Sequence, residues 1–222
     1  MSDIFQEVDE SLQQDRVLGF WNRFKYLIYA LIAALIIGVA GYEIYKWQSA
    51  RTSEKEATAF YEARTALLDN EDPAGAAQLF GQIAASDSAF AELSAHFLAE
   101  IQLVENEDEA AAIATLKTAA EGDGVFADAA RLKAAYLMAD DSDLATLESW
   151  LQPLTSEAGA PLGYLALEVI GSRAFSLGDY DVARQKYNAI TMSLDVPANV
   201  EQRAQVALEV LNVLESVDGS SS

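Results

Sequence analysis

Hydrophobic residues along the chain form one long uninterrupted stretch and a series of shorter helical stripes. The long stretch covers residues 26–42, seventeen residues without a charge, and continues through Ile44 and Tyr45 past a single Glu43. At about 1.5 Å rise per residue, a helix over residues 26–45 spans roughly 30 Å, the thickness of the hydrocarbon core of a bilayer. The pattern therefore predicts one transmembrane helix over residues 26–45.

Residues suited to the headgroup level of a bilayer flank this stretch on both sides. The aromatic residues are Trp21 and Tyr26 at one end and Tyr42, Tyr45 and Trp47 at the other, with Arg23, Lys25 and Lys46 beside them. A cleaved signal peptide is the alternative. However, the region before the stretch is 25 residues long, and the far end shows no small-x-small cleavage site. We expect a permanent anchor.

The segment before the anchor, residues 1–25, places Ile4, Phe5, Val8 and Leu12 on one helical face. We expect an N-terminal tail that is partly an amphipathic helix, able to dock on a partner or to lie on the membrane. Its five acidic residues disfavour binding to anionic lipid. A mobile tail is the other interpretation.

Beyond the anchor the pattern is helix, turn, helix throughout, because Ala, Leu, Glu and Gln dominate and no β-branched run alternates with period two. Polar breaks fall near residues 72, 108, 141 and 179, at spacings of 36, 33 and 38. A period in the mid-thirties made of helix pairs indicates a helical solenoid. We predict an all-α chain with four helix pairs and a capping helix over residues 46–217, followed by a disordered tail, 218–222.

Apolar spacing also predicts which residues of the first two pairs face inward. These are Phe60, Tyr61, Leu67 and Leu68 in the first pair, and Leu93, Phe97, Ile101 and Val104 in the second. In the capping helix, residues 200–217, the inward face is Ala204, Leu208, Leu211 and Leu214.

The fourth unit has the clearest motif. It reads Leu167, Ile170, Gly171, Ala174, then Gly178-Asp179-Tyr180, Ala183, Tyr187 and Ile190, with Pro197 beyond. This resembles the tetratricopeptide-repeat pattern, in which small residues such as Gly171 and Ala183 let two helices cross closely. In the second unit the alignment places Glu100 where this glycine stands, so the first three units rest on period and pattern alone.

As a whole, the chain resembles the YfgM-like tetratricopeptide-repeat proteins, which are ancillary subunits of the SecYEG translocon in Gram-negative bacteria. The resemblance lies in a start like SDIFQEVDESLQQDR, one anchor, a Trp-Gln exit and a divergent repeat domain. It implies a cytoplasmic N-terminus and a repeat domain in the periplasm. The implied partners are the Sec translocon, periplasmic chaperones and secreted chains. Charge alone does not orient the anchor, because three basic residues precede it and three follow it closely.

The formal net charge of −21 lies mainly in residues 46–222, which contribute −18. Such an acidic domain repels nucleic acid and anionic lipid surfaces at long range, which disfavours a nucleic-acid role. The chain has no cysteine, so disulfides, thiol catalysis and thiolate metal sites are excluded.

Candidates for catalysis are poor. His96 is the only histidine, and helical spacing places it near Glu92 and Glu100. We interpret it as a surface histidine between acidic side chains rather than as a metal ligand. Other motifs are interpreted structurally: residues 122–124 and 105–109 as turns, and Phe175, Tyr180 and Tyr187 as core. We therefore expect no enzyme, no cofactor and no metal, and we assign no binding residue.

Two classes of function remain. The first is an interaction protein, a single-pass anchor carrying a solenoid that binds protein partners. Its client is the Sec translocon, or alternatively a respiratory or cytochrome complex that it helps to assemble. The second class is a helical domain that binds a small molecule or acts as an enzyme, which would need convergent polar groups in a deep pocket.

Overall fold

The computed structural model describes residue 42 and residues 51–156, 160–193 and 195–219. The chain divides into two compact units, Met1–Lys55 and Glu56–Ser222, and the fold described below is that of the second. The predicted tail, residues 1–25, and the predicted anchor, residues 26–45, lie outside the described residues except for residue 42. Within the described residues, no helix has the length and apolar character needed to cross a membrane.

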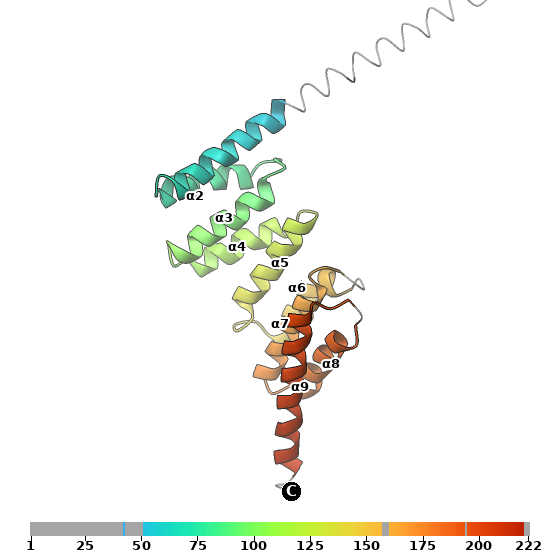
Figure 1. The fold of residues 1–222 in the computed structure, drawn as a ribbon. Coiled ribbons are helices and arrows are strands. Elements are labelled where there is room, and N and C mark those ends of the chain that lie inside the picture. Colours follow the sequence, from blue (N-terminus) through green and yellow to red (C-terminus); the bar gives the residue numbers. More distant parts are fainter. Residues whose placement is uncertain (1–41, 43–50, 157–159, 194, 220–222) are drawn as a thin grey trace, which may run out of the picture. The chain divides into compact units, whose positions relative to one another are not determined.

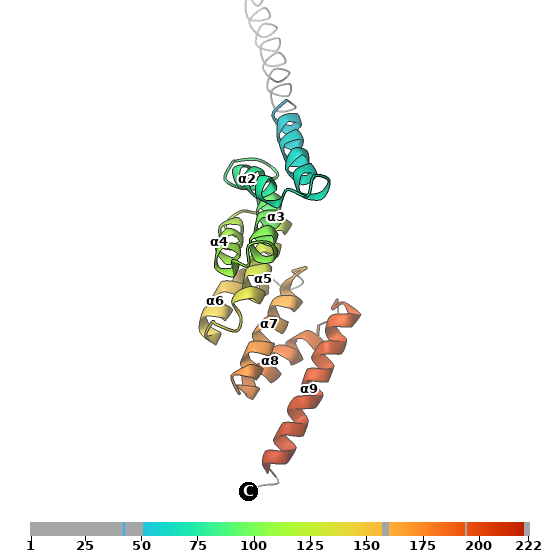
Figure 2. The same cartoon turned by 90° about the vertical axis from the view of Figure 1, so that its left-hand side faces the viewer.

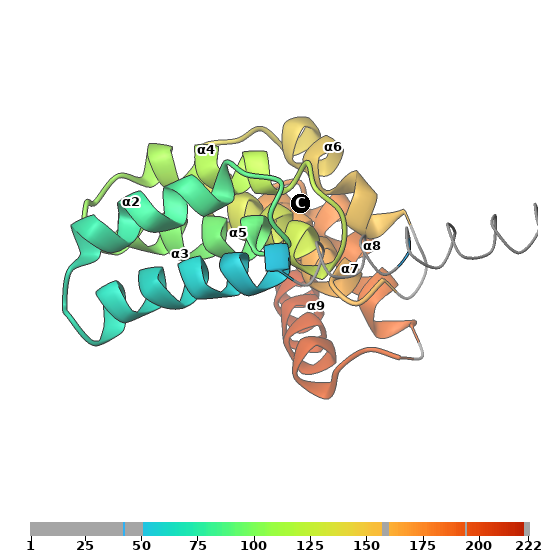
Figure 3. The same ribbon diagram turned by 90° about the horizontal axis from the view of Figure 1, so that it is seen from above.

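All regular structure in the described ranges is helical, as predicted (Figure 1). The first helix covers residues 51–68. The others are α2 (Pro73–Ala84), α3 (Ala91–Val104), α4 (Glu109–Ala119), α5 (Val125–Met138), α6 (Leu144–Thr155), α7 (Gly163–Ser176), α8 (Tyr180–Thr191) and α9 (Ala198–Gly219). They form four successive pairs, the first of which is the helix over 51–68 with α2 (Figure 3).

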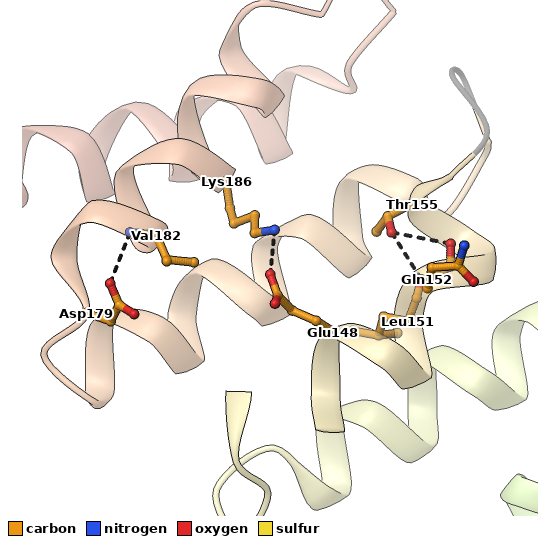
Figure 4. A network of polar contacts seen from close by, with 7 residues as sticks. All are labelled: Glu148, Leu151, Gln152, Thr155, Asp179, Val182 and Lys186. Atoms are coloured by element: carbon orange, nitrogen blue, oxygen red, sulfur yellow. Dashed lines mark hydrogen bonds and ion pairs between the residues drawn. The ribbon is translucent and has the colours of Figure 1, made fainter. Parts of the chain in front are cut away.

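An aspartate caps the second helix of every pair. Asp72, Asp108, Asp143 and Asp179 each accept a hydrogen bond from the backbone N–H three residues on, at 2.9, 2.9, 2.7 and 3.2 Å. Figure 4 shows this bond from Val182 to Asp179. The caps are spaced by 36, 35 and 36 residues. The predicted third break near residue 141 is therefore two residues early, because Asp143 provides the cap.

The turns within the first two pairs are alike and one residue longer than the turn of the fourth. Glu71 and Glu107 adopt left-handed backbone conformations with φ of 52° and 51°, whereas glycine takes this conformation at Gly178, with φ of 79°. Such a residue lets the chain reverse sharply after a helix. The extra residue shifts the first helices of these two pairs by one position relative to their caps.

This shift corrects the predicted place of Glu100. The small residues at the helix crossings are Ala63, Ala99, Ala135 and Gly171, at intervals of 36 residues, and all are buried. Ala99 is 3% exposed and packs with Ala112 and Leu116 of α4, whereas Glu100 points outward.

At the fourth crossing the structure confirms the tetratricopeptide interpretation of Gly171. A Cβ atom placed there would lie 3.2 Å from Cζ of Tyr187 and 3.3 Å from Cβ of Lys186. Tyr187 itself is buried, and Phe175 and Tyr180 pack against the same core with ring centroids 5.6 Å apart. These aromatic residues form core, as predicted.

The first pair is held by an aromatic cluster instead. The ring of Phe60 lies 5.7 Å from Phe80 and 5.1 Å from Phe90, and Phe80 stacks on Phe97 at 4.9 Å. The predicted inward stripe was partly wrong, since Tyr61, Leu68 and Val104 are all more than half exposed. The inward face of these helices is centred on the buried alanines Ala63 and Ala99, and these three side chains lie outside it.

The helix α9 covers the end of the stack (Figure 2). Ala204 and Leu211 are fully buried against the α8 side, and Leu208 packs with them, as predicted for a capping helix. The helix runs beyond the predicted end at residue 217, to Gly219, and residues 220–222 of the predicted tail lie outside the described residues. On its other side α9 exposes Val206, Val210 and Val213.

The third pair is more open than the others. The backbones of α5 and α6 approach each other over much less of their length than those of α3 and α4 or of α7 and α8. The residue opposite the crossing is alanine in the other pairs, at Ala76, Ala112 and Ala183, but Leu147 in the third, where it is fully buried. A leucine occupies more space than an alanine, so we infer that Leu147 holds α5 and α6 apart.

Candidate interaction surface

The first helices of successive pairs pack side by side, α3 on α5, α5 on α7, and α7 on α9. Residues exposed along them therefore form one continuous face, called here the first-helix face. The 36-residue register places Arg64, Glu100, Tyr136 and Ser172 at the same position on this face, immediately after each crossing residue, and all four are exposed. The repeat thus sets how the face is built.

An apolar pocket of about 210 Å³ opens on this face between α3 and α5. Ala99, Leu103, Leu116 and Leu137 line it, with Glu100, Lys133 and Tyr136 also contributing. Lys133 Nζ lies 3.8 Å from Glu100 Oε2, and both side chains are about half exposed, so the pair contributes little to stability. An apolar pocket with charges beside it can accept an apolar side chain while the charges orient its neighbours.

The face continues as a polar cluster over α5, α7 and α9. Arg203 donates two hydrogen bonds to the Glu168 carboxylate, at 2.5 and 2.6 Å, and these raise the pKa of Arg203. Partial burial raises the pKa of Tyr136, and the negative charge of Glu168 raises it further. Tyr136 is 52% exposed and stays a neutral phenol near neutral pH, so its hydroxyl can donate a hydrogen bond to a partner.

His96 lies at the edge of this face, and its surroundings differ from the prediction. The side chain is half-buried, and its Nε2 lies 2.9 Å from the carbonyl oxygen of Phe126, to which it donates. Burial lowers the pKa of His96 more than this hydrogen bond raises it. Glu92 lies close to Gly122. Within the described chain, no group of three His, Asp or Glu side chains could hold a metal ion.

The two acidic or glycine-rich segments are turns, as expected. Gly124 has φ of 89° and is the N-cap of α5. In the 105–109 segment, Asp108 caps α4 and Glu107 takes the left-handed conformation. Neither segment contributes to the first-helix face.

The sequence profile of the tetratricopeptide repeat-like domain family matches residues 19–213. The chain belongs to this family. Domains of this kind generally mediate protein–protein interactions through their repeat surfaces. No match was found among curated proteins, and none among solved structures.

The tetratricopeptide register would have identified residues that the sequence analysis missed. Tyr136 and Lys133 were not singled out, because no inward face was predicted for the first helix of the third pair and Glu100 was placed at the crossing of the second pair. The sequence does contain a signal for the correct register: alanine at positions 63, 99 and 135 recurs every 36 residues, and Gly171 follows at the same interval. Arg203 and Glu168 lie 35 residues apart, and no local pattern connects them.

Proposed function

We propose that this tetratricopeptide repeat-like protein is a membrane-anchored scaffold for protein–protein interactions, and more specifically an ancillary subunit of the Sec translocon of the YfgM-like kind. It would connect the translocon to periplasmic chaperones and secreted chains. The observation that supports a scaffold best is the apolar pocket between α3 and α5 with Glu100, Lys133 and Tyr136 beside it. Such a pocket suits an apolar side chain of a protein partner.

The anchor in this proposal is the predicted transmembrane helix over residues 26–45, whose sequence lies within the family match. The protein would be a single-pass protein of the bacterial inner membrane, with its N-terminus in the cytoplasm and its repeat domain in the periplasm. A domain tied closely to the membrane has a raised effective concentration toward partners in the same membrane. Clients that emerge from the translocon would then meet the repeat domain early.

We further propose that the protein has no catalytic activity and needs no cofactor. His96 donates to a backbone carbonyl and has a lowered pKa, which suits a structural role. The first-helix face combines apolar, aromatic and paired charged groups, the chemistry of a binding surface.

The direct test replaces residues 1–47 with an unrelated single-pass anchor of equal length. Co-purification with the translocon from gently solubilised membranes should be lost, while circular dichroism of the repeat domain stays unchanged. A reporter fused after Ser222 should be active only if it functions in the periplasm. If the natural chain instead co-purifies with a respiratory or cytochrome complex, the translocon assignment is wrong and the assembly-scaffold alternative is supported.

A second test addresses the pocket itself. Leu103→Asp places a charge in the apolar pocket, and Gln185→Asp, at an exposed position of α8, adds the same charge elsewhere. The first variant should lose co-purified chaperone or secreted chain, whereas the second should retain it. Equal retention by both would mean that the pocket is not the contact site.

A further inference from the structure

A second surface lies on the side of the second helices, where the third pair is open. A groove of about 670 Å³ runs between α4 and α6 over α5. Its lining includes Lys117, Arg131, Ser142, Thr146, Ser149 and Trp150. Ile113, Met138 and Ala145 complete the lining, so the groove differs from the first-helix pocket by adding cations, hydroxyls and an indole ring to apolar side chains.

Trp150 and Arg131 hold the floor of the groove in a fixed geometry. The indole Nε1 of Trp150 donates to the carbonyl oxygen of Arg131 at 2.9 Å, and Arg131 Nη1 donates to the carbonyl of Trp150 at 3.3 Å. Arg131 Nη2 also donates to the carbonyl of Ala120 at 2.6 Å. These bonds connect α5 to α6 and to the end of α4, so Arg131 has a structural role.

Lys117 stands apart from this network. Its side chain is exposed, and its Nζ lies 5.7 Å from the centroid of the Trp150 ring, while the guanidinium carbon of Arg131 lies 4.8 Å from the same ring. Two cations therefore lie near one indole, an arrangement that places positive charge next to an apolar ring.

The charges in the groove are unusual for this chain. Residues 46–222 have a net charge of −18, yet no carboxylate lines the groove. Over the described ranges, Lys117 and Arg131 have no carboxylate within 4.0 Å, as is also the case for Arg64 and Arg173, whereas Lys133, Arg184, Lys186 and Arg203 each have one. A local positive site in an acidic domain is complementary to a ligand whose negative charge is equally local.

We propose that this groove binds a short acidic segment of a partner protein. A carboxylate of the segment faces Lys117, the hydroxyl of Ser149 donates a hydrogen bond to it, and an apolar side chain packs on the Trp150 ring. A polyanion such as nucleic acid or an anionic bilayer experiences the field of the whole acidic domain and is repelled. A short peptide lies within about one Debye length, roughly 8 Å at physiological salt, and experiences mainly the local cations.

The site is independent of the anchor and of the translocon assignment, because α4, α5 and α6 supply all of it. It also differs from the first-helix face, so one partner on each surface can bind at the same time. Failure of peptide binding at the groove therefore leaves the proposed function untouched, and loss of translocon co-purification leaves the groove untouched.

The test uses the full chain in a mild neutral detergent and a fluorescein-labelled hexapeptide that alternates glutamate and leucine. Lys117→Glu should weaken binding about fivefold, measured by fluorescence anisotropy, since it replaces an attraction by a repulsion. Lys133→Glu reverses the same charge on the first-helix face and should change the affinity by less than about twofold. A peptide with glutamine in place of glutamate should bind as weakly to the wild type as the acidic peptide binds to Lys117→Glu.

Four results would overturn the proposal. Equal affinity for the glutamine peptide would mean that charge does not matter at the site. An unchanged affinity in Lys117→Glu would place the peptide elsewhere. Absence of peptide binding together with a lowered melting temperature in Lys117→Glu would show that the cations only stabilise the third pair. Binding of phosphate or of vesicles containing phosphatidylglycerol in place of the peptide would assign the groove to another anion.

Discussion

The third and fourth helix pairs share a period, an aspartate cap and a stack, but they differ at the crossing of their two helices. In the fourth pair, Gly171 lies against Tyr187 and Lys186 of α8, and the helices approach closely over much of their length. In the third pair, Ala135 faces Leu147, the helices separate, and the Trp150 and Arg131 bonds connect them. The fourth pair is closed core, whereas the third presents a groove.

This difference shows how a repeat protein can acquire a binding site without a new element. One larger side chain at a buried position changes the spacing of two helices, and the space that opens is lined by whatever the outer positions carry. In this chain the residues at those positions include the cations Lys117 and Arg131 and the aromatic Trp150.

The largest expected effect comes from truncating the core of the third pair. Leu151→Ala should lower the free energy of unfolding by about 2–5 kcal/mol, because Leu151 is fully buried. Leu147→Ala removes an equally buried side chain but should cost about 2 kcal/mol, at the low end, since α5 and α6 can close on the smaller residue. Urea denaturation compares the two, and an equal loss would mean that the third crossing cannot close.

At the fourth crossing the opposite change should destabilise the fold. Gly171→Leu forces a side chain against Tyr187 and Lys186 and should cost on the order of 1–3 kcal/mol. Gly81→Ala is the matched control, because its Cβ would meet only Leu98 Cδ2 at 3.8 Å. It should leave stability unchanged or raise it by up to about 1 kcal/mol through helix propensity. A Gly171→Leu melting curve like that of the wild type would exclude the close crossing.

The aspartate cap that all four pairs share should contribute less to the free energy of unfolding. Asp179→Ala removes the side chain that accepts the Val182 N–H and should cost about 1 kcal/mol, whereas Asp179→Asn, which can still accept it, should cost a few tenths. Asp108→Ala should give a similar loss in the second pair. Thermal melting measures both. Unequal losses would indicate that the caps do not act alike in the two pairs.

The smallest expected effect is the contribution of His96 to the pH dependence of stability. Burial lowers the pKa of His96 in the folded chain below the ordinary value of 6.5, so folding favours the neutral ring. Its contribution to stability is fully present above pH 6.5 and declines as the pH falls from 6.5 through the lowered pKa. The difference in melting temperature between the wild type and His96→Gln should therefore change between pH 7.5 and pH 5.5. A constant difference would contradict a lowered pKa.

Much of the fold follows from the sequence because helix pairs repeat with a period that polar breaks reveal. The predicted breaks near residues 72, 108 and 179 coincide with the capping aspartates, and the Gly171 crossing was recognised because Gly171 and Ala183 occupy the small-residue positions of the tetratricopeptide pattern. The register of the first two pairs was predicted incorrectly. A glutamate in a left-handed turn, at Glu71 and Glu107, adds one residue that composition does not reveal.

The candidate sites were harder to predict. To predict the pocket near Tyr136, the register of α3 and α5 must be known. An error of one residue in the register exchanges a buried side chain for an exposed one. The groove at Trp150 is lined by residues of α4, α5 and α6, so it depends on how two successive pairs stack, which no local pattern in the sequence reveals. Arg131 and Trp150 lie 19 residues apart, and each side chain donates a hydrogen bond to the backbone carbonyl oxygen of the other.

The distance between the two helices of a pair can be measured with spin labels. Because the chain has no cysteine, labels attach only to cysteines that are introduced. Spin labels on cysteines introduced at Tyr136 and Ser149 span the third pair, and labels at Ser172 and Gln185 span the fourth at equivalent positions, all of them exposed. Double electron–electron resonance should give a longer distance in the third pair, and Leu147→Ala should shorten it while leaving the fourth unchanged. Equal distances in the two pairs, or a third-pair distance that Leu147→Ala does not change, would contradict the account.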